Sequence, residues 1–437
     1  MDKILQIIKQ EKKRQEETLM MIPSENYSYP EVRTAVGSVL MHKYSEGYPK
    51  KRYYQGNEFI DEIEQLCRSR ALELFKLDSE KWSVNVQALS GTPANLAIMN
   101  ALLEPGDKIL SMFLYDGGHL SHGWSFKGKN ITLSSKIWNI NFYYVDPATG
   151  RFGYARIDEL ARKVRPKLVV SGGTAYAPEI DHRRLYAIAK KVGAYYLADV
   201  SHEAGLIAGG ANRRPFEYAD VVMMTTHKTL RGPRGALIFS RKEIADKIDS
   251  SVFPGVQGGP HNHTIAGIAV ALEKAKSQEF KNYAHQTVAN AKALATELKW
   301  KGFRIVSGST EKHLVLVDLQ SKKVSGWFVG WALEAAGIIT NRSTVPADSA
   351  TPYYPSGLRL GTPALTTRGM KEEQMKTIAG WIAKVVEHIG ARTIPEDPEK
   401  RLKELKAFKE EVFKDKFLLG INKEVKALCN KFPIDLG

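Results

Sequence analysis

Short apolar runs alternate with amphipathic segments through the first 280 residues of the chain. The runs Lys167–Val170, Tyr195–Ala198 and Val221–Met224 are typical of buried strands. Apolar residues at helical spacing predict amphipathic helices over residues 58–76 and 181–192. Because strands that alternate with helices form a mostly parallel sheet covered on both faces, the pattern predicts an α/β fold. Ligands of such folds lie beyond the carboxyl ends of the strands.

The pattern changes after about residue 276. A long helical pattern over residues 280–301 leads to an isolated apolar run, Leu314–Val317, and residues 402–413 form a charged amphipathic pattern. These features indicate a smaller α+β domain. The expected limits are residues 1–45 for an N-terminal arm, 46–276 for a large domain and 277–437 for a small C-terminal domain.

Composition narrows the class of protein. Of the 437 residues, 43% are hydrophobic and 25% are charged, which is ordinary for a globular protein, and no apolar run is as long as a membrane span. The net charge of +15 is spread along the chain and mixed with acids, so we expect neither nucleic acid nor a membrane as a partner. Two cysteines do not make a disulfide framework, which predicts a reducing cytoplasm.

Lys228 has the strongest chemical signal in the sequence. It stands between an apolar run and a turn rich in glycine and proline. Desolvation and nearby cations lower the pKa of a lysine, and His227, Arg231 and Arg234 are close in sequence. A lysine with a lowered pKa can form a Schiff base with an aldehyde. The alternative is a lysine in a surface loop, which is the commoner fate of a single lysine.

Two further motifs fit a pyridoxal phosphate site. Asp199 follows the run Tyr195–Ala198, so it should lie at a strand end, where a carboxylate suits the protonated ring nitrogen of this cofactor. The segment 90–92, Ser-Gly-Thr, opens a predicted helix, and the N–H groups at a helix N-terminus bind phosphate. Each motif has an ordinary alternative, because Asp199 and Ser90 can both be plain helix caps.

Other polar residues give weaker signals. Arg359, flanked by glycines, suits a clamp for a substrate carboxylate, although a surface ion pair is the default for an arginine. His119 and His122 are three residues apart, but no third ligand stands at a convincing spacing. We therefore expect no metal site.

The motifs and their order together resemble those of the serine hydroxymethyltransferase family, within the aminotransferase-like group of pyridoxal phosphate enzymes. The likeness runs from about residue 15 to the C-terminus. The matching blocks are 23–27 (PSENY), 43–49 (KYSEGYP), 52–54 (RYY), 117–122 (GGHLSH), 199–202 (DVSH), 225–235 (TTHKTLRGPRG), 253–260 (FPGVQGGP) and 356–363 (SGLRLGTP). The resemblance implies an aminotransferase-like large domain with a mostly parallel seven-stranded sheet covered by helices, and a smaller α+β C-terminal domain. It also implies a homodimer with shared active sites.

The resemblance further implies roles for particular residues. At the cofactor ring it places Lys228 at the aldehyde, Asp199 at the ring nitrogen, His119 on the ring face, and Thr174 and His202 near the phenolic oxygen. At the cofactor phosphate it places Ser90, Gly91, Thr92 and His227. Thr225 would also contact the cofactor, and Arg234 would support the loop that binds it. From the other subunit, Tyr44 and Gly259 would reach the phosphate, and Glu46 and Tyr54 the substrate side chain and the pterin. Arg359 and Ser24 would bind the amino acid carboxylate, and Leu114, Gly118, Leu120 and Ser343 the pterin. The catalytic residues would be Lys228, Glu46, His119, Asp199, Tyr54 and His202.

The implied activity is reversible transfer of the serine hydroxymethyl group to a reduced pterin, which gives glycine and the 5,10-methylene pterin. Three positions depart from the commoner bacterial pattern of the family: Pro93 replaces a glutamine, Asp116 a histidine and Ser343 an asparagine. These departures leave the pterin open between tetrahydrofolate, the first choice, and a modified pterin such as tetrahydromethanopterin.

Two other functions compete with this interpretation. A pterin-independent aldolase for threonine-like β-hydroxy amino acids would use the same lysine chemistry, although Ser24 and the segments 44–54 and 117–119 favour the transferase. A non-catalytic homologue that binds RNA through its basic surface is the second alternative. Lys228, Asp199 and Arg359 are all present, which argues against a homologue that has lost its catalytic activity.

Overall fold

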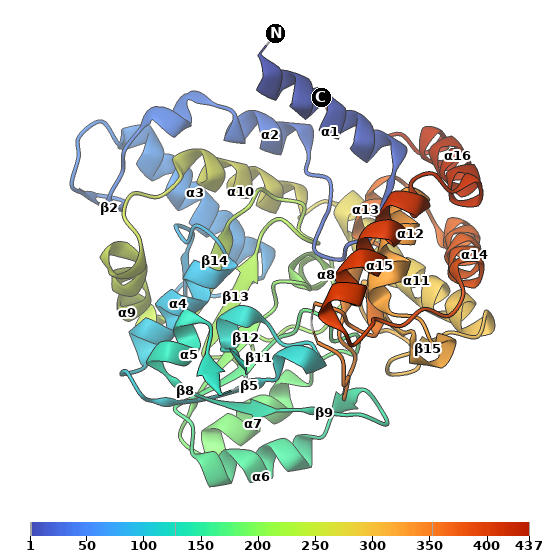
Figure 1. The fold of residues 1–437 in the computed structure, drawn as a ribbon. Coiled ribbons are helices and arrows are strands. Elements are labelled where there is room, and N and C mark those ends of the chain that lie inside the picture. The colour runs from blue at the N-terminus through green and yellow to red at the C-terminus, as the bar shows by residue number, and fades with distance from the viewer. Residues whose placement is uncertain (1, 127, 352, 437) are drawn as a thin grey trace. The chain divides into compact units, whose positions relative to one another are not determined.

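A seven-stranded sheet forms the centre of the larger of two structural units (Figure 1). The computed structural model describes residues 2–126, 128–351 and 353–436. The larger unit comprises Ser28–Asp146 and Arg151–His285. The smaller unit comprises Pro147–Gly150 and the described parts of residues 1–27 and 286–437. No helix among the described residues is both long and apolar enough to cross a membrane.

The central sheet is almost entirely parallel, as the sequence pattern predicts. In spatial order its strands are β4 (Trp82–Asn85), β14 (Ala236–Arg241), β13 (Val221–Thr225), β12 (Tyr195–Asp199), β11 (Leu168–Ser171), β5 (Lys108–Met112) and β8 (Asn139–Tyr143). Strand β14 pairs antiparallel with both of its neighbours, and the pairs from β13 to β8 are parallel. The carboxyl ends of β11, β12 and β13 therefore open on the same edge.

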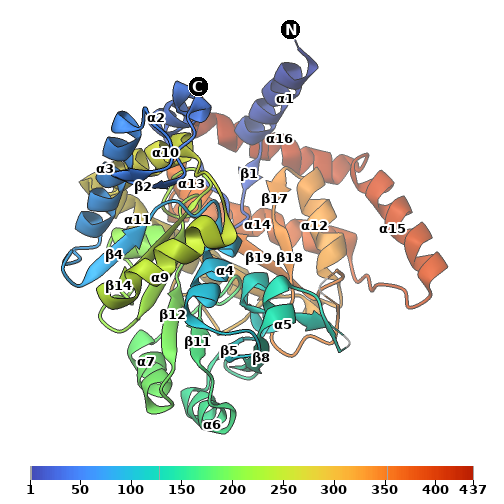
Figure 2. The same cartoon turned by 90° about the vertical axis from the view of Figure 1, so that its left-hand side faces the viewer.

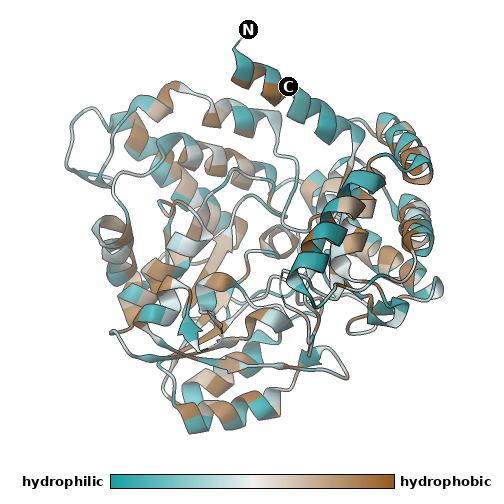
Figure 3. Ribbon diagram, viewed as in Figure 1, coloured by the Kyte–Doolittle hydropathy of each residue, from teal (hydrophilic) through white to brown (hydrophobic). Residues whose placement is uncertain are grey.

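Helices cover both faces of this sheet because successive strand residues point to opposite sides. Helices α3 (Glu58–Leu74), α6 (Tyr154–Val164) and α7 (His182–Lys191) share a buried core with one set of strand residues, including Val222 and Met224. Helices α4 (Gly91–Leu102) and α9 (Ala245–Ser250) share a second core with the alternate set, including Val221 and Met223. Figures 1 and 2 show these helices along the sheet. Figure 3 colours the same ribbon by residue hydropathy.

Shorter elements complete the larger unit. They are α2 (Pro30–Val36), the hairpin β2 (Gly47–Tyr48) and β3 (Lys51–Arg52), the hairpin β6 (Ser125–Phe126) and β7 (Lys129–Asn130), α5 (Leu133–Ile137), the pair β9 (Val145–Asp146) and β10 (Arg151–Phe152), α8 (Ala204–Ala208) and α10 (Asn262–Lys274).

The smaller unit is built on a four-stranded antiparallel sheet in the order β15 (Arg304–Ile305), β16 (Leu314–Asp318), β19 (Gly357–Gly361) and β18 (Asn341–Ser343). Its helices are α1 (Lys3–Glu17), most of α11 (Gln278–Trp300), α12 (Gly326–Ala335), α13 (Pro363–Thr367), α14 (Glu372–Ile389), α15 (Pro398–Val412) and α16 (Lys416–Lys431). This arrangement matches the expected α+β character.

The two units divide the chain differently from the expected domain limits of 45/46 and 276/277. Strand β1 (Leu19–Met20) pairs in parallel with β17 (Ile338–Ile339), so the N-terminal segment up to residue 27 groups with the smaller unit. The later division falls at His285, inside α11. Hydrophobic periodicity does not reveal either feature, because a two-residue strand has no period and a helix can continue across a domain boundary.

The expected elements lie close to the observed ones. The helix predicted over 58–76 is α3, which ends at Leu74, and the helix predicted over 181–192 is α7. The patterns over 280–301 and 402–413 correspond to α11 and α15. The ends differ by a few residues, which is the usual uncertainty of helix boundaries.

Arg368 anchors the N-terminal segment within the smaller unit. Its Nη1 donates to the carbonyls of Cys429 and Phe432 at 3.2 and 2.9 Å, and its Nη2 donates to the carbonyls of Gln15 and Glu16 at 2.7 and 2.8 Å. Arg368 is buried. One guanidinium thus joins the ends of α1 and α16.

We expect Arg368→Met to lower the free energy of unfolding by about 3 kcal/mol, because four hydrogen bonds from one buried, charged donor are lost. Thermal unfolding followed by circular dichroism measures the change. Lys423→Met, at an exposed position of α16, is the matched control and should leave the melting temperature nearly unchanged. Equal melting temperatures for the two variants would contradict the anchoring role.

Candidate active site

Lys228 lies in the turn between β13 and β14. Its Nζ donates to Oγ1 of Thr225, the last residue of β13, at 2.7 Å. Backbone hydrogen bonds close the turn, from Thr226 N to the Gly235 carbonyl at 3.1 Å and from Gly232 N to the Thr226 carbonyl at 2.8 Å. The lysine amine is therefore held near the carboxyl end of the sheet, where ligands of this fold bind.

Asp199 is the last residue of β12 and is 8% exposed. Its Oδ1 accepts hydrogen bonds from Ser201 N at 3.0 Å and Ser201 Oγ at 2.6 Å. Its Oδ2 accepts from Asn95 Nδ2 at 3.0 Å and lies 2.9 Å from His122 Nε2. The cap position of the next helix, α8, is Glu203, so Asp199 does not have the helix-capping role that the sequence left open.

These contacts decide the charge of Asp199. Burial by itself raises the pKa of a carboxyl group, but the hydrogen bond and charge of His122, together with His119 and Ser201, hold the pKa of Asp199 well below its usual range. The carboxylate is therefore ionised at neutral pH. A buried anion of this kind can keep a pyridine nitrogen protonated.

The N-terminus of α4 lies against the same strand end. The helix begins at Gly91, and the side chain of its cap residue, Ser90, makes no capping hydrogen bond. A Cβ atom at Gly91 would lie 2.7 Å from Cγ2 of Thr225, so glycine is needed for this close approach. The N–H groups of an uncapped helix start, next to the residue that holds Lys228, suit a phosphate group.

His227 adds a neutral imidazole to the turn that contains Lys228. Burial, followed by the charges of Lys228 and Arg234, lowers the pKa of His227 to about 3. Its Nδ1 is shielded from solvent and has no hydrogen-bond partner among the described residues. A phosphate oxygen would satisfy this nitrogen. Arg234 itself is exposed in the turn.

His119 is tied to Asp199 through a chain of hydrogen bonds. Its Nδ1 lies 2.7 Å from Oγ of Ser121 and accepts from Ser121 N at 3.2 Å, and Asn95 Nδ2 donates to the same Oγ at 2.8 Å. The imidazole rings of His119 and His122 are 5.7 Å apart at 62°. His122, the second histidine of the motif, thus contacts Asp199. The spacing of the two histidines suggested only a weak metal-binding motif and did not predict this contact.

The remaining cofactor and pterin candidates of the larger unit lie on loops of that sheet. Thr174 N donates to the carbonyl of Gly117 at 2.6 Å, which joins the loop after β11 to the loop after β5. The carbonyl of His202 accepts a hydrogen bond at 2.9 Å from Oγ1 of Thr229, the residue that follows Lys228. The pterin candidates of the β5 loop are Leu114, Gly118 and Leu120.

Two of the departures from the family pattern have structural explanations. Asp116 is buried, and its Oδ2 accepts from Val145 N at 3.0 Å, so this carboxylate secures the backbone beyond β8. Pro93 occupies the third position of α4, where the missing N–H leaves no hydrogen bond of the helix unmade.

A second group of candidates gathers around the β2–β3 hairpin. Oη of Tyr54 lies 3.3 Å from Oε2 of Glu46, and the rings of Tyr44 and Tyr54 meet edge to face at 5.3 Å. A Cβ atom at Gly259 would lie 3.2 Å from the Tyr44 ring, and one at Gly258 would lie 3.2 Å from Glu46 Oε1. The four residues that the resemblance assigns to the other subunit's site are thus neighbours in this chain.

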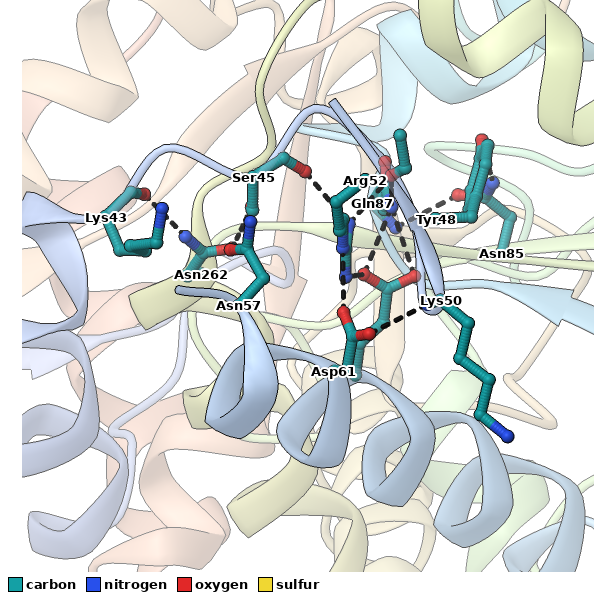
Figure 4. A network of polar contacts seen from close by, with 12 residues as sticks. Lys43, Ser45, Tyr48, Lys50, Arg52, Asn57, Asp61, Asn85, Gln87 and Asn262 are labelled. Atoms are coloured by element: carbon teal, nitrogen blue, oxygen red, sulfur yellow. Dashed lines mark hydrogen bonds and ion pairs between the residues drawn. The ribbon is translucent and has the colours of Figure 1, made fainter. Parts of the chain in front are cut away.

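Arg52 holds the backbone on both sides of Glu46 (Figure 4). Its Nη1 donates to the carbonyl of Ser45 at 2.9 Å and to the carbonyl of Gly47 at 2.7 Å. Because both flanking carbonyls are bound by one guanidinium, the direction of the Glu46 side chain depends on Arg52.

Arg52 is in turn fixed by two carboxylates of α3. Its Nε donates to Asp61 Oδ1 at 2.9 Å and its Nη2 donates to Glu64 Oε2 at 2.7 Å. Gln87 Nε2, just beyond β4, donates to the carbonyl of Gly47 at 2.9 Å and to Glu64. A buried guanidinium whose donors are met by carboxylates and carbonyls is well stabilised.

Arg359 and the other substrate candidate, Ser24, belong to the smaller unit. Arg359 lies in the middle of β19, is 6% exposed, and donates through Nε to Asn341 Oδ1 at 3.1 Å. Burial lowers its pKa to about 10, so it remains a cation at neutral pH. Pro23, next to Ser24, lies so close to Gly361 that a Cβ atom there would meet the Pro23 Cα. The pterin candidate Ser343 is the last residue of β18.

Several of these residues were missed by the sequence reasoning. They are Asn95, Ser201, Asn341, Arg52, Glu64 and Gln87. Asn95 lies one helical turn after Gly91, so a search for polar residues on the first turns of the phosphate-binding helix would have found it. Arg52 has no comparable signal, although its partners lie within 12 residues along the chain, because the contacts depend on how the β2–β3 hairpin folds against α3.

The residues of the larger unit fit pyridoxal phosphate. An amine, a buried anion and an uncapped helix start lie around one sheet edge, and His227 has an unsatisfied nitrogen there. Lys228 would hold the aldehyde, Asp199 the ring nitrogen, and residues 90–92 with His227 the phosphate. Bound there, the cofactor would supply an acceptor for the electron pair left on a substrate carbon.

Comparison with known proteins gives the family. Residues 1–382 match the family model described as serine hydroxymethyltransferase. A serine hydroxymethyltransferase of Caenorhabditis elegans is 44% identical over 447 aligned residues, which cover 99% of this chain and 87% of the relative. One from Acidothermus cellulolyticus is 50% identical over 382 residues, 87% of each chain.

Schizosaccharomyces pombe has two similar proteins with different stated compartments. The one named mitochondrial is 45% identical over 446 residues, with 98% of this chain and 91% of the relative covered. The one named probable cytosolic is 43% identical over 447 residues, with 99% and 95% covered. With a family model that covers most of its length and relatives at this identity, the chain belongs to the serine hydroxymethyltransferase family.

Proposed function

We propose that the cluster around Lys228 and Asp199 is the cofactor site in which this chain transfers the hydroxymethyl group of serine to tetrahydrofolate. As a member of its family, the chain is a pyridoxal-phosphate-dependent one-carbon transferase that interconverts serine and glycine. The observation that supports the location of the site is the convergence of the Lys228 amine, the ionised Asp199 and the start of α4 on one sheet edge.

Each residue has a distinct chemical task in this proposal. Asp199 keeps a proton on the cofactor ring nitrogen, which makes the ring a better electron acceptor. Arg359 binds the carboxylate of serine, and Asn341 fixes the plane of its guanidinium. Glu46 moves a proton at the serine hydroxymethyl oxygen, and Tyr54, hydrogen-bonded to Glu46, helps to orient its carboxyl group.

We further propose that two chains pair and exchange Tyr44, Glu46, Tyr54 and Gly259 between their sites. The exposed surface supports pairing, because seven large hydrophobic side chains are solvent-exposed in one stretch of chain. They are Val39, Met41, Tyr44, Tyr53, Tyr54, Phe59 and Leu66.

The compartment and other partners are also proposals. Cys67 and Cys429 are buried and are not joined in a disulfide, which is consistent with a reducing compartment such as the cytoplasm. Many basic side chains at the surface form ion pairs with acids, for example Lys190 and Lys276, which supports the absence of a nucleic-acid partner.

Assays with serine test the reaction directly. We expect conversion of serine to glycine to depend on added tetrahydrofolate, and cleavage of threonine to be slower. Equal rates with and without the pterin, together with faster threonine cleavage, would favour the aldolase. Faster turnover with a modified pterin would move the assignment to that acceptor.

Asp199→Asn should lower the turnover of serine by about 10² to 10³-fold, because a neutral amide no longer stabilises the protonated ring nitrogen. Steady-state kinetics with the cofactor content measured by absorbance separates lost turnover from lost cofactor. Asp249→Asn is the matched control, since burial raises the pKa of this aspartate in the same unit and no cofactor role is proposed for it. A similar loss in both variants would contradict the role of Asp199.

Mixed dimers test the exchange between chains. Lys228→Ala and Glu46→Gln chains, each inactive alone, should give about a quarter of wild-type activity when co-expressed in equal amounts, because half of the dimers then contain one complete site. The control pair is Lys228→Ala with Asp199→Asn, whose defects belong to the same chain's site and should not complement. No recovery in the first pair, or equal recovery in both, would contradict a shared site.

A further inference from the structure

The smaller unit contains a cavity of about 320 Å³ that the proposed reaction does not use. One wall is a face of α12 with Trp327, Gly330, Trp331 and Glu334, which are spaced at about one helical turn. The other wall is the chain around the start of β18, residues 340–342. The volume lies at the lower end of the usual range for ligand pockets.

Arg342 is the unusual residue of this cavity. The aliphatic part of its side chain lies next to Gly330. A Cβ atom at Gly330 would be 3.5 Å from Cγ and 4.0 Å from Cδ of Arg342. Its Nη1 is shielded from solvent and has no hydrogen-bond partner in the described part of the chain. Burial lowers its pKa, and the titratable neighbours that act on it are the phenols of Tyr353 and Tyr354. A shielded guanidinium nitrogen without an acceptor is costly and needs an explanation.

Arg342 lies on the opposite face of the sheet from Arg359, although Asn341 both lines the cavity and bonds Arg359. In the register of β18 and β19, Asn341 is opposite Arg359 and Arg342 is opposite Leu358. Since neighbouring strand residues point to opposite faces, Arg342 faces away from Arg359. Leu358 belongs to the buried core that also contains Trp327, so Arg342 is on the α12 side of the sheet.

The cavity offers three kinds of contact. Arg342 provides a cation, and Thr340 adds a shielded hydroxyl without a partner among the described residues. Glu334 is the one acid among the described residues of the lining, and partial burial raises its pKa. Trp327 and Trp331 provide flat apolar surfaces, and Lys409 covers the Trp331 ring at 3.7 Å from its centroid.

We propose that this cavity binds an α-amino acid with an apolar or aromatic side chain, at a site separate from the catalytic one. Arg342 and Thr340 receive the carboxylate, Glu334 receives the ammonium group and the two indoles pack on the side chain. An α-amino acid carries both charges on one carbon, and its volume suits the cavity. An amine would leave the shielded Nη1 of Arg342 without an acceptor, and a simple anion would make no contact with Glu334.

Titration of the holoenzyme with phenylalanine tests the site. Saturating glycine keeps the site around Lys228 occupied, and tryptophan fluorescence with calorimetry follows binding near Trp327 and Trp331. We expect one saturable site per chain. Phenylalaninamide, which lacks the carboxylate, and 3-phenylpropionate, which lacks the ammonium group, should each bind roughly tenfold or more weakly.

Two variants separate the cavity from general damage to the fold. Arg342→Met removes the cation, and Gly330→Asp places a carboxylate beside the Arg342 stem, where a Cβ atom meets only ordinary contacts. Both should weaken phenylalanine binding at least tenfold while the melting temperature and cofactor absorbance stay unchanged. Lys423→Met, on α16, is the control and should bind as the wild type does.

Three results would overturn the proposal. The first is the absence of saturable binding to the wild-type holoenzyme. The second is equal affinity of wild type and Gly330→Asp for phenylalanine. The third is binding of the amide or of 3-phenylpropionate as tightly as the amino acid, which would show that Arg342 or Glu334 does not contact the ligand.

Discussion

The ionised carboxylate of Asp199, buried at the end of β12, places the strictest demand on the surrounding chain. A buried charge is stable only when hydrogen-bond donors surround it. Ser201, Asn95 and His122 supply those donors from three segments. The loop after β5, the first turns of α4 and the turn after β12 all have to meet at one point, and Lys228 lies in the turn just beyond the adjacent strand, β13.

Arginines follow the same rule in other parts of the molecule. Arg52 is held by Asp61 and Glu64 and in turn holds the backbone around Glu46. Arg368 meets four carbonyls. Arg342 differs from Arg52 and Arg368, because its shielded Nη1 has no hydrogen-bond partner among the described residues.

The agreement between sequence and structure is best where a local pattern decides the outcome. The apolar runs before Asp199 and Lys228 are strands β12 and β13, and both residues lie at or just beyond their carboxyl ends. The helix that the sequence predicts to open at residues 90–92 is α4, which begins at Gly91. Strand burial and helix starts depend on a few adjacent residues, so a sequence shows them directly.

The sequence alone determined the α/β architecture, the order of its strands and helices along the chain, and the family blocks that identify the chemistry. Only the tertiary structure decided that His122 supports Asp199, that Asp116 secures the backbone near Val145, and that residues up to 27 group with the C-terminal unit. It also decided that the guanidinium groups of Arg52 and Arg368 have hydrogen-bond acceptors, whereas Nη1 of Arg342 has none among the described residues. The reason is that a hydrogen bond between distant segments depends on strand order and side-chain direction, and no local pattern contains either.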